Sequence, residues 1–263
     1  MNFRTRTLLG LCAASIGVAC VDLSAPSGAA SISTLLLPSP SVVLGDVMRD
    51  SNGAPAPISV VAYDANNSPV PGLTAQFFIT DSLHAAHLDN KNEIVGDKIG
   101  TVRVLGQIGS LQTAAVSIPV TYAPDHIKIV GTADSVVAPL SRDSATSIGT
   151  VSLPVSVRSV GDSASQGFIV SYTITYAPVT AASSKSAAVY LVSDAGAAAT
   201  ADTTDASGSA GVKVLVNSLY LAARDSIYAN TKPESVVVLA STKYKGVPVG
   251  GSPAKFVIKL RVK

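Results

Sequence analysis

Two segments decide the fold: Ile58-Ser59-Val60-Val61-Ala62-Tyr63-Asp64 and, after a turn, Pro71-Gly72-Leu73-Thr74-Ala75-Gln76-Phe77. Both can be laid without a gap, at an offset of 95 residues, on Leu153-Pro154-Val155-Ser156-Val157-Arg158-Ser159 and Gln166-Gly167-Phe168-Ile169-Val170-Ser171-Tyr172. In each copy, two β-prone runs flank turn-forming residues, which predicts two strands joined by a turn. A repeat of this size predicts two copies of one sandwich-sized module.

Further matches extend the repeat on both sides. Upstream, Ser41-Val42-Val43 matches Ser135-Val136-Val137 and Arg49-Asp50-Ser51 matches Arg142-Asp143-Ser144, at offsets of 94 and 93. Downstream, residues 100–105 are similar to residues 210–215, at an offset of 110. The larger downstream offset predicts an insertion of about fifteen residues in the second copy, within 178–185 and 196–206.

The chain after residue 30 has the pattern of an all-β protein. Short runs of Val, Ile, Thr and Tyr alternate with Gly, Pro, Asn, Asp and Ser clusters, and no segment predicts a helix. Further strands are expected at 155–157, 168–175, 212–216, 235–240 and 256–262. We therefore predict two tandem β-sandwich domains, at residues 33–123 and 124–263.

The strand and turn motifs also carry a family resemblance. The segment from Val61 to Phe78 contains an apolar strand, an Asp-bearing turn, Pro-Val-x-Gly and a second strand, and the second copy adds a T-x-D-x-x-G-x-A-x-V segment from Thr203 to Val212. Both resemble bacterial immunoglobulin-like domains of the invasin and intimin type, with residues 97–100 at the place of the Asp turn in the first copy. The resemblance implies tandem immunoglobulin-like sandwiches that serve as spacers or adhesive modules.

Residues 1–19 have the sequence pattern of a signal peptide. Arg4 and Arg6 precede an apolar stretch from Leu8 to Ala19, followed by Cys20. This stretch is shorter than the roughly 20 residues of a membrane-spanning helix. The alternative interpretation is a buried N-terminal helix.

Cys20 is the expected lipidation site. Gly17-Val18-Ala19-Cys20 resembles the bacterial lipoprotein signal, in which the Cys is acylated and becomes the new N-terminus. The only other Cys is Cys12, inside the leader, so the mature chain cannot form an internal disulfide. We expect residues 20–32 to be a lipidated Cys and flexible tether at the cell envelope, with the outer membrane favoured over the inner. Ordinary secretion with cleavage after Ala19 is the alternative.

Charge argues against nucleic-acid binding. Without Arg4 and Arg6, 17 basic residues balance 17 acidic ones, and no Lys or Arg run occurs. Phosphate neutralisation needs a basic patch or stripe. We expect no nucleic-acid partner.

Three histidines and one serine are candidates for metal binding or catalysis. His84 and His87 have a metal-ligand spacing, with Asp81 and Asp89 nearby. Because no helix is predicted there, we interpret them as loop residues, and His126 as a surface linker residue. The triplet Gly161-Asp162-Ser163 is similar to the nucleophile block of some serine hydrolases, but the repeat predicts a hairpin turn there. We therefore expect no catalytic residues, no metal and no cofactor.

Oxygen-rich loops are candidate calcium sites, and one further loop is basic and aromatic. Calcium could bind oxygen-rich segments around Asp64 or around Asp194, Asp202 and Asp205. Ordinary turn chemistry is favoured, because Asp and Asn bond to their own backbone. The segment from Lys243 to Gly246 is interpreted as a solvated loop tip.

The sequence therefore predicts a non-catalytic envelope lipoprotein with a structural, adhesive or protein-binding role. The alternative is a secreted or surface module that binds a glycan or other ligand through the long second-domain loops near 181–186 and 197–207. Expected partners are the membrane, through the lipid, and a protein or surface polymer. Prolines at strand starts and edges favour a monomer: Pro38, Pro40, Pro57, Pro119 and Pro154.

Overall fold

A computed structural model describes residues 28–80, 83–131, 135–140, 148–179, 188–221, 227 and 234–262, with the backbone alone at 135–139 and 262. The signal peptide, Cys20, Asp81 and the match at Arg142-Asp143-Ser144 lie outside these residues.

The first domain is built from one larger sheet and two small ones. The larger sheet has the order β2-β9-β7-β4, with β8 beside β7, and the small sheets pair β1 with β3 and β5 with β6. Its strands are β1 (Ser31–Ile32), β2 (Val42–Val43), β3 (Ala62–Tyr63), β4 (Gln76–Thr80), β5 (Ala86–Leu88), β6 (Ile94–Gly96), β7 (Gly100–Ile108), β8 (Leu111–Gln112) and β9 (Val116–Thr121).

The second domain is a sandwich of two sheets. One sheet has the order β10-β12-β16-β14 and the other β11-β20-β17-β13-β15. Their strands are β10 (His126–Ile129), β11 (Ser135–Leu140), β12 (Ile148–Arg158), β13 (Ile169–Tyr176), β14 (Val189–Val192), β15 (Ala201–Thr203), β16 (Ser209–Asn217), β17 (Glu234–Ser241) and β20 (Ala254–Val262). A short hairpin joins β17 to β20 through β18 (Lys243–Tyr244) and β19 (Val247–Pro248), and a 3₁₀ helix, η1 (Ser218–Tyr220), follows β16.

Each domain has its own apolar core, made by the alternation of side chains along the strands. Val102, Val104 and Ile118 are fully buried in the first core, and Val214 and Phe256 in the second. In β12 and β16 every second residue is buried, as expected where one face of a strand covers a core. The predicted fold class is confirmed: the chain is all-β, with two immunoglobulin-like sandwiches in tandem.

The backbone repeats the offset of 95 residues found in the sequence. Asn67 and Asp162 have positive φ angles of 61° and 59°, and Gly72 and Gly167 both have φ of 80°. Upstream, β2 and β11 each lie parallel to the last strand of their domain. Val120 and Leu260 are equivalent positions of these last strands, because they pair with the first residues of β7 and β17. Val42 pairs with Val120 and Ala138 pairs with Leu260, so the structural offset is 96 residues, whereas the sequence match gave 94.

The downstream part of the sequence alignment is wrong. It placed residues 100–105, in β7, on residues 210–215, in β16. However, β7 pairs with β4 and β9, as β17 pairs with β13 and β20, whereas β16 lies in the opposite sheet. The counterpart of β7 is therefore β17. Both β7 and β16 alternate Val with other residues, and this alternation does not reveal which sheet a strand joins.

The Asp turn of the first domain lies at Asp89, not at residues 97–100. The Asp89 carboxylate accepts the backbone N–H groups of Lys91 and Glu93, and Asn92 has φ of 62°. Asp205 accepts from Ser207 and Ser209 in the same way, before Gly208 with φ of 72°. The offset from Asp89 to Asp205 is 116, which is 21 more than 95, so the insertion before this turn exceeds the expected size.

The folded chain begins earlier than the expected tether end at residue 32. Ser31 and Ile32 pair with Tyr63 and Ala62, and Ala29 is buried against the core. A spacer after Cys20 would therefore be shorter than predicted.

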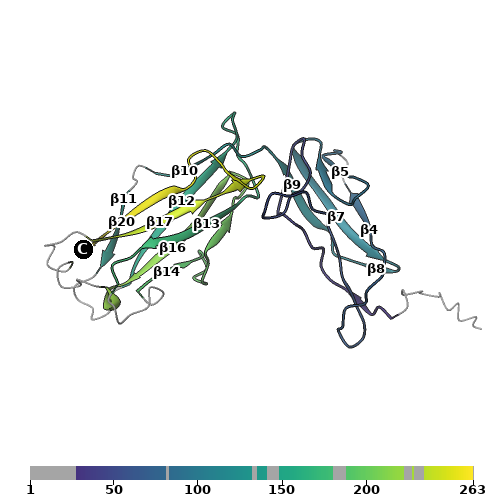
Figure 1. Cartoon of the computed structure of the whole chain (residues 1–263), viewed down its shortest axis with the longest axis horizontal. Helices are drawn as coiled ribbons and strands as arrows, with labels where there is room; N and C mark the ends of the chain where they lie inside the picture. The colour runs from purple at the N-terminus through teal and green to yellow at the C-terminus, as the bar shows by residue number, and fades with distance from the viewer. Residues whose placement is uncertain are drawn as a thin grey trace, which may run out of the picture.

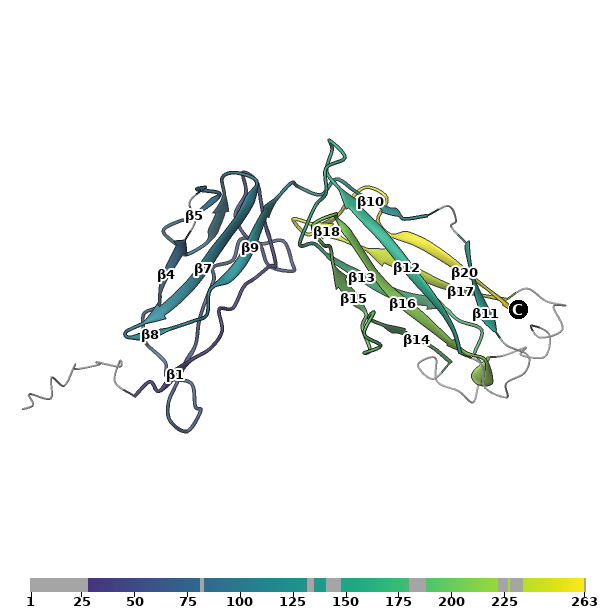
Figure 2. The ribbon, with the colours of Figure 1, turned by 180° about the vertical axis from the view of Figure 1, so that it is seen from behind.

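The two sandwiches lie end to end, at an angle to each other (Figure 1). In both ribbon views, β1 lies at the end of the first domain away from the second, and β20 ends at the far end of the second domain (Figure 2). Within the described ranges, the structure has no helix with the length and apolar character that crossing a membrane needs.

Candidate functional site at the domain junction

Asp46 is the centre of the contact between the domains. It follows β2 in the first domain, and its Oδ2 accepts hydrogen bonds from Tyr244 Oη at 2.5 Å and from Arg49 Nε at 2.9 Å. Lys245 Nζ lies 3.2 Å from the same oxygen. Arg49 belongs to the first domain, whereas Tyr244 and Lys245 belong to the β18–β19 hairpin of the second. One carboxylate thus bridges both domains.

The electrostatics of this cluster follow from partial burial and several donors. Burial alone would raise the pKa of Asp46, but hydrogen bonds from Arg49, Tyr244 and Lys245 outweigh it and hold the pKa well below its usual range. Burial, and then the hydrogen bond to Asp46, raise the pKa of Tyr244 well above its usual range. At neutral pH the cluster is therefore a carboxylate held by two cations and a neutral phenol.

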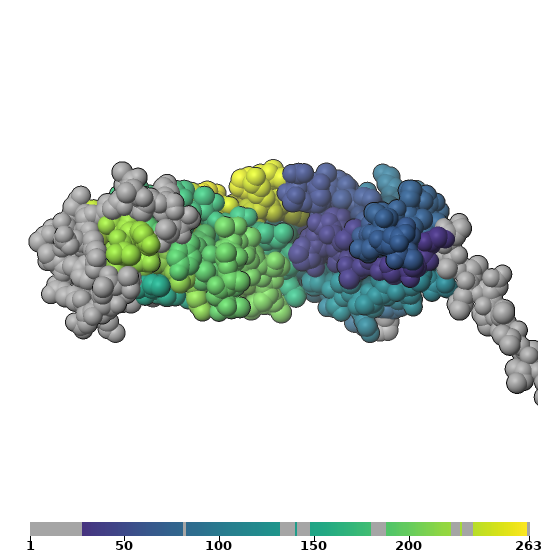
Figure 3. Space-filling model, turned by 90° about the horizontal axis from the view of Figure 1, so that it is seen from below, coloured from purple at the N-terminus to yellow at the C-terminus, as the bar shows by residue number. Residues whose placement is uncertain are grey.

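Glycines allow the two backbones to approach closely beside Asp46. A Cβ added to Gly53 would lie 2.2 Å from Gly246 N, and one added to Gly246 would lie 2.8 Å from Asn52 O. A Cβ on Gly167 would lie 2.4 Å from Ser41 Cβ. These distances are shorter than non-bonded carbon contacts allow, so the junction requires glycine at these positions. Figure 3 shows the yellow part of the second domain directly against the purple and blue part of the first.

Further contacts connect the domains around the same point. Ser41 Oγ donates to Gly167 O at 3.3 Å, and Gln166 N donates to Thr121 Oγ1 at 2.9 Å. Inside the second domain, the Phe168 ring lies edge-to-face on Tyr244, with centroids 6.2 Å apart, and supports the tyrosine that reaches Asp46.

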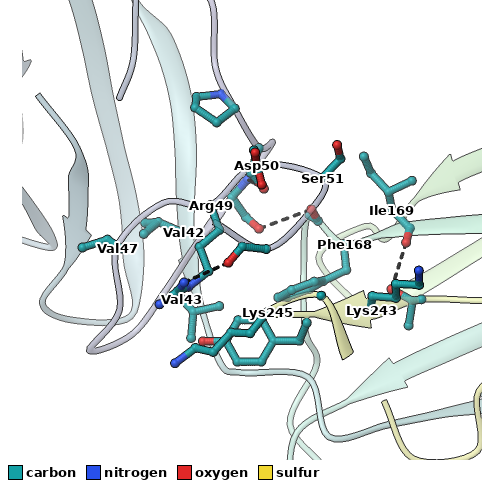
Figure 4. A pocket seen from close by; sticks show the side chains of 18 of the residues that line it. Val42, Val43, Val47, Arg49, Asp50, Ser51, Phe168, Ile169, Lys243 and Lys245 are labelled. Atoms are coloured by element: carbon teal, nitrogen blue, oxygen red, sulfur yellow. Dashed lines mark hydrogen bonds between the residues drawn. The ribbon is translucent and has the colours of Figure 1, made fainter. Parts of the chain in front are cut away.

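A cleft of about 280 Å³ opens beside these contacts. In Figure 4, Arg49, Asp50 and Ser51 of the first domain face Phe168 and Ile169 of the second. Arg49 donates to Asp46 and to Gly53 O, both in its own domain, so its guanidinium is already paired and orients Asp46 towards the second domain.

His84, His87 and Asp89, the candidate metal residues that the structure describes, form no metal-binding group. His87 Nδ1 lies 2.6 Å from Asp97 Oδ2, and Asp89 caps its own turn. His84 has φ of 49° before β5, as expected for a loop residue, whereas His87 lies within β5 and pairs with Val95, so its interpretation as a loop residue is wrong. Over the described part of the chain, no three His, Cys, Asp or Glu side chains are grouped to hold a metal ion.

The Gly161-Asp162-Ser163 segment is a turn, as predicted. Ser163 N donates to Ser159 Oγ, and Asp162 has φ of 59°. His126 differs from the prediction of a surface linker residue, because it begins β10 and its side chain is only 20% exposed. Its Nδ1 lies 3.0 Å from Asp125 Oδ2 and its Nε2 lies 3.9 Å from Asp162 Oδ1.

The acidic loops are turn structures rather than one cluster. The Asp64 carboxylate accepts from Asn66 N and Ser68 N, and Asp205 caps its own loop. Asp202 accepts from Gly211 N, and Asp194 pairs with Lys213. Of the long second-domain loops, 181–186 lies outside the described residues, and 197–207 contains β15.

Sequence reasoning missed Asp46 and misinterpreted the segment from Lys243 to Gly246. That segment is a hairpin tip, as expected, but Tyr244 and Lys245 bind Asp46 almost 200 residues away in sequence. The available signal was Lys245-Gly246, a two-residue turn with φ of 52° and 77°. Nothing local indicates what such a tip contacts.

No protein-family model matches the chain, and no curated protein matches it in sequence. Among solved structures, it is similar to domains 4 and 5 of the S-layer protein SbsC, with 13% identity, a TM-score of 0.31, and coverage of 89% of this chain and 99% of that one. It is also similar to the Yersinia pseudotuberculosis adhesin InvE (17% identity, TM-score 0.35, coverage 88% and 60%) and the Escherichia coli adhesin FdeC (17%, 0.29, 88% and 62%). The chain spans only 28% of a longer SbsC structure.

Proposed function

We propose that this chain is a non-catalytic lipoprotein of the bacterial cell envelope, in which two rigidly joined immunoglobulin-like domains act as a structural, adhesive or protein-binding spacer. The observation that carries the proposal is the bridge at Asp46. A carboxylate held from both domains, beside glycines in backbone contact, favours one relative orientation of the domains over free rotation about the linker. A fixed orientation is what a spacer needs in order to present its far end at a set distance.

The proposed lipid anchor at Cys20 would orient the two domains relative to the membrane. Cys20 lies eight residues before Gly28, the first described residue, and eight extended residues reach at most about 29 Å. Acylation at Cys20 would hold the first domain near the membrane and direct the second domain away from it. The proposed units are residues 33–123, to which the structure adds Ala29 and β1, and residues 124–263, in a monomer at the outer membrane.

Lipid labelling tests the anchor. Cells that express the full chain are fed labelled palmitate, and the intact mass is measured for wild type, Cys20→Ala and Cys12→Ala. We expect a lipid-sized mass increment and label in wild type and in Cys12→Ala, and neither in Cys20→Ala. An unlabelled, soluble wild-type chain would contradict the anchor and leave a secreted two-domain protein.

A further inference from the structure

Strand β4 is an edge of the first domain that no described strand covers. It pairs only with β7, whereas its counterpart β13 lies between β17 and β15. In both ribbon views β4 lies at the outer side of its sheet (Figures 1 and 2). The two domains therefore differ at equivalent edges.

The difference has a structural cause in the strand before each Asp turn. In the second domain this strand is β15, which pairs with residues Ile169 to Ser171 of β13. In the first domain it is β5, which pairs with β6 in a separate two-stranded sheet and not with β4. The positions that would receive a strand like β15 are Thr74 to Gln76, at the offset of 95, and β4 continues that edge.

The backbone of β4 offers hydrogen-bonding groups on the open side. Phe77 pairs with Gly106, but Gly106 N donates to Thr113 Oγ1 and Gly106 O accepts from Thr113 N. In an antiparallel ladder, the N–H and C=O of Phe77 and Ile79 then point away from β7. Tyr172, the counterpart of Phe77, uses this direction to donate to Thr200 O at 2.7 Å.

The side chains show what chemistry would fit. The sequence of β4, Gln-Phe-Phe-Ile-Thr, has no charge and no proline, which are the usual protections of an open edge. Phe78 is 42% exposed, and Phe77 and Ile79 are only half-buried, whereas Tyr172 is 2% exposed beneath its covered edge. An added strand would complete this burial with apolar residues on its inner face.

We propose that β4 is a docking edge for an extended, uncharged segment of a partner protein, which adds antiparallel to the sheet as β15 adds to β13. This deepens the proposed protein-binding role and rests on the proposed anchor. A two-fold pair of β4 strands from two copies would be antiparallel, so the second domain of one copy would point towards the membrane that anchors the other. A foreign segment has no such conflict.

The test uses the full chain with Cys20→Ala and a blocked peptide of alternating threonine and valine. We expect the peptide to slow amide hydrogen exchange at Phe77 and Ile79 by about tenfold or more at saturation. A peptide N-methylated at alternate residues, which cannot complete the ladder, should have no effect. Unchanged exchange at Phe77 and Ile79 with the unmodified peptide would overturn the proposal.

Two matched variants locate the site. Phe78→Lys should weaken peptide binding about tenfold or more, because it places a charge beside the added strand. Ile169→Lys changes a residue of similar exposure, 48%, on the edge that β15 covers, and should leave binding unchanged. Equal loss in both variants would overturn the site.

Sedimentation tests whether the partner is a second copy of this chain. If the protein forms concentration-dependent dimers and Phe78→Lys abolishes them, the occupant of β4 is a second copy and not a foreign segment. None of these measurements needs the lipid, so they and the labelling experiment can fail separately.

Discussion

Gly72 and Gly167 occupy the same turn position in the two domains, with the same φ of 80°, but only Gly167 contacts the other domain. Alanine at either position should cost about 1 kcal/mol, because its Cβ disfavours positive φ. Gly167→Ala should cost about 1–3 kcal/mol more, since its Cβ would overlap Ser41. Urea unfolding of both variants measures the difference. Equal losses would show that the junction tolerates the methyl group.

Asp46→Asn tests the charged centre of the junction. The amide keeps the shape but loses the carboxylate that faces Arg49, Tyr244 and Lys245, and Arg49 would then lie partly buried without its ion pair. We expect a loss of about 1–3 kcal/mol in unfolding free energy, mostly from Arg49 and Tyr244, because Lys245 is half exposed. The control is Asp194→Asn, whose carboxylate is 87% exposed beside Lys213 and which should change stability by less than about 0.5 kcal/mol. Similar losses in both variants would contradict a special role for Asp46.

The same cluster predicts how stability depends on pH. The folded pKa of Asp46 is lowered, so its stabilisation is present above its ordinary value of 3.8 and is lost as pH falls from there towards the folded pKa. The folded pKa of Tyr244 is raised, so its contribution is present below its ordinary value of 10.0 and is lost as pH rises above that. The stability gap between wild type and Asp46→Asn, measured by urea unfolding across pH, should be widest between these values and shrink below pH 3.8. A gap that stays constant into acid would contradict this assignment.

At the scale of elements, the Asp-capped turns fix where one strand ends and the next begins. The Asp205 carboxylate accepts the Ser207 hydroxyl and the backbone N–H groups of Ser209 and Ser207, which together lower its pKa, and the turn leads directly into β16. We expect Asp205→Ala to lower the melting temperature, because two backbone donors lose their acceptor, and Asp205→Asn to lower it less. Circular dichroism measures both, with Asp194→Ala as an exposed control. If Asp205→Ala melts like that control, the cap is unimportant.

The elements also show what the sequence could and could not predict. The strand-turn-strand unit at offset 95 was predictable because Asp, Asn and Gly favour turn conformations through local backbone preferences. The match of β7 to β16 failed because strand alternation reports burial on one face and not the neighbouring strand. The contact of Tyr244 with Asp46 could not be predicted either, since it depends on how two finished domains meet.

At the scale of the whole molecule, the junction decides whether the two domains behave as one body. The linker around Tyr122 to Pro124 is short, but the contacts that fix orientation come from the β18–β19 hairpin and the turn at Asp50. Rigidity therefore depends on contacts that can be removed one at a time, while each core remains intact.

Tyr244→Phe is the mildest such removal, because it deletes only the hydroxyl that donates to Asp46 Oδ2 and keeps the ring against Phe168. In the wild type, ¹⁵N relaxation should give one tumbling time for both domains. In Tyr244→Phe combined with Lys245→Ala, which removes both donors from the second domain, the two domains should tumble faster and differently, and small-angle scattering should show a broader distribution of shapes. Tyr176→Phe, at an exposed tyrosine of β13, is the control and should match wild type. If the double variant still tumbles as one body, the glycine contacts and the Ser41 and Thr121 hydrogen bonds are enough to hold the two domains together. Asp46 would then affect the stability of the junction and not the relative orientation of the domains.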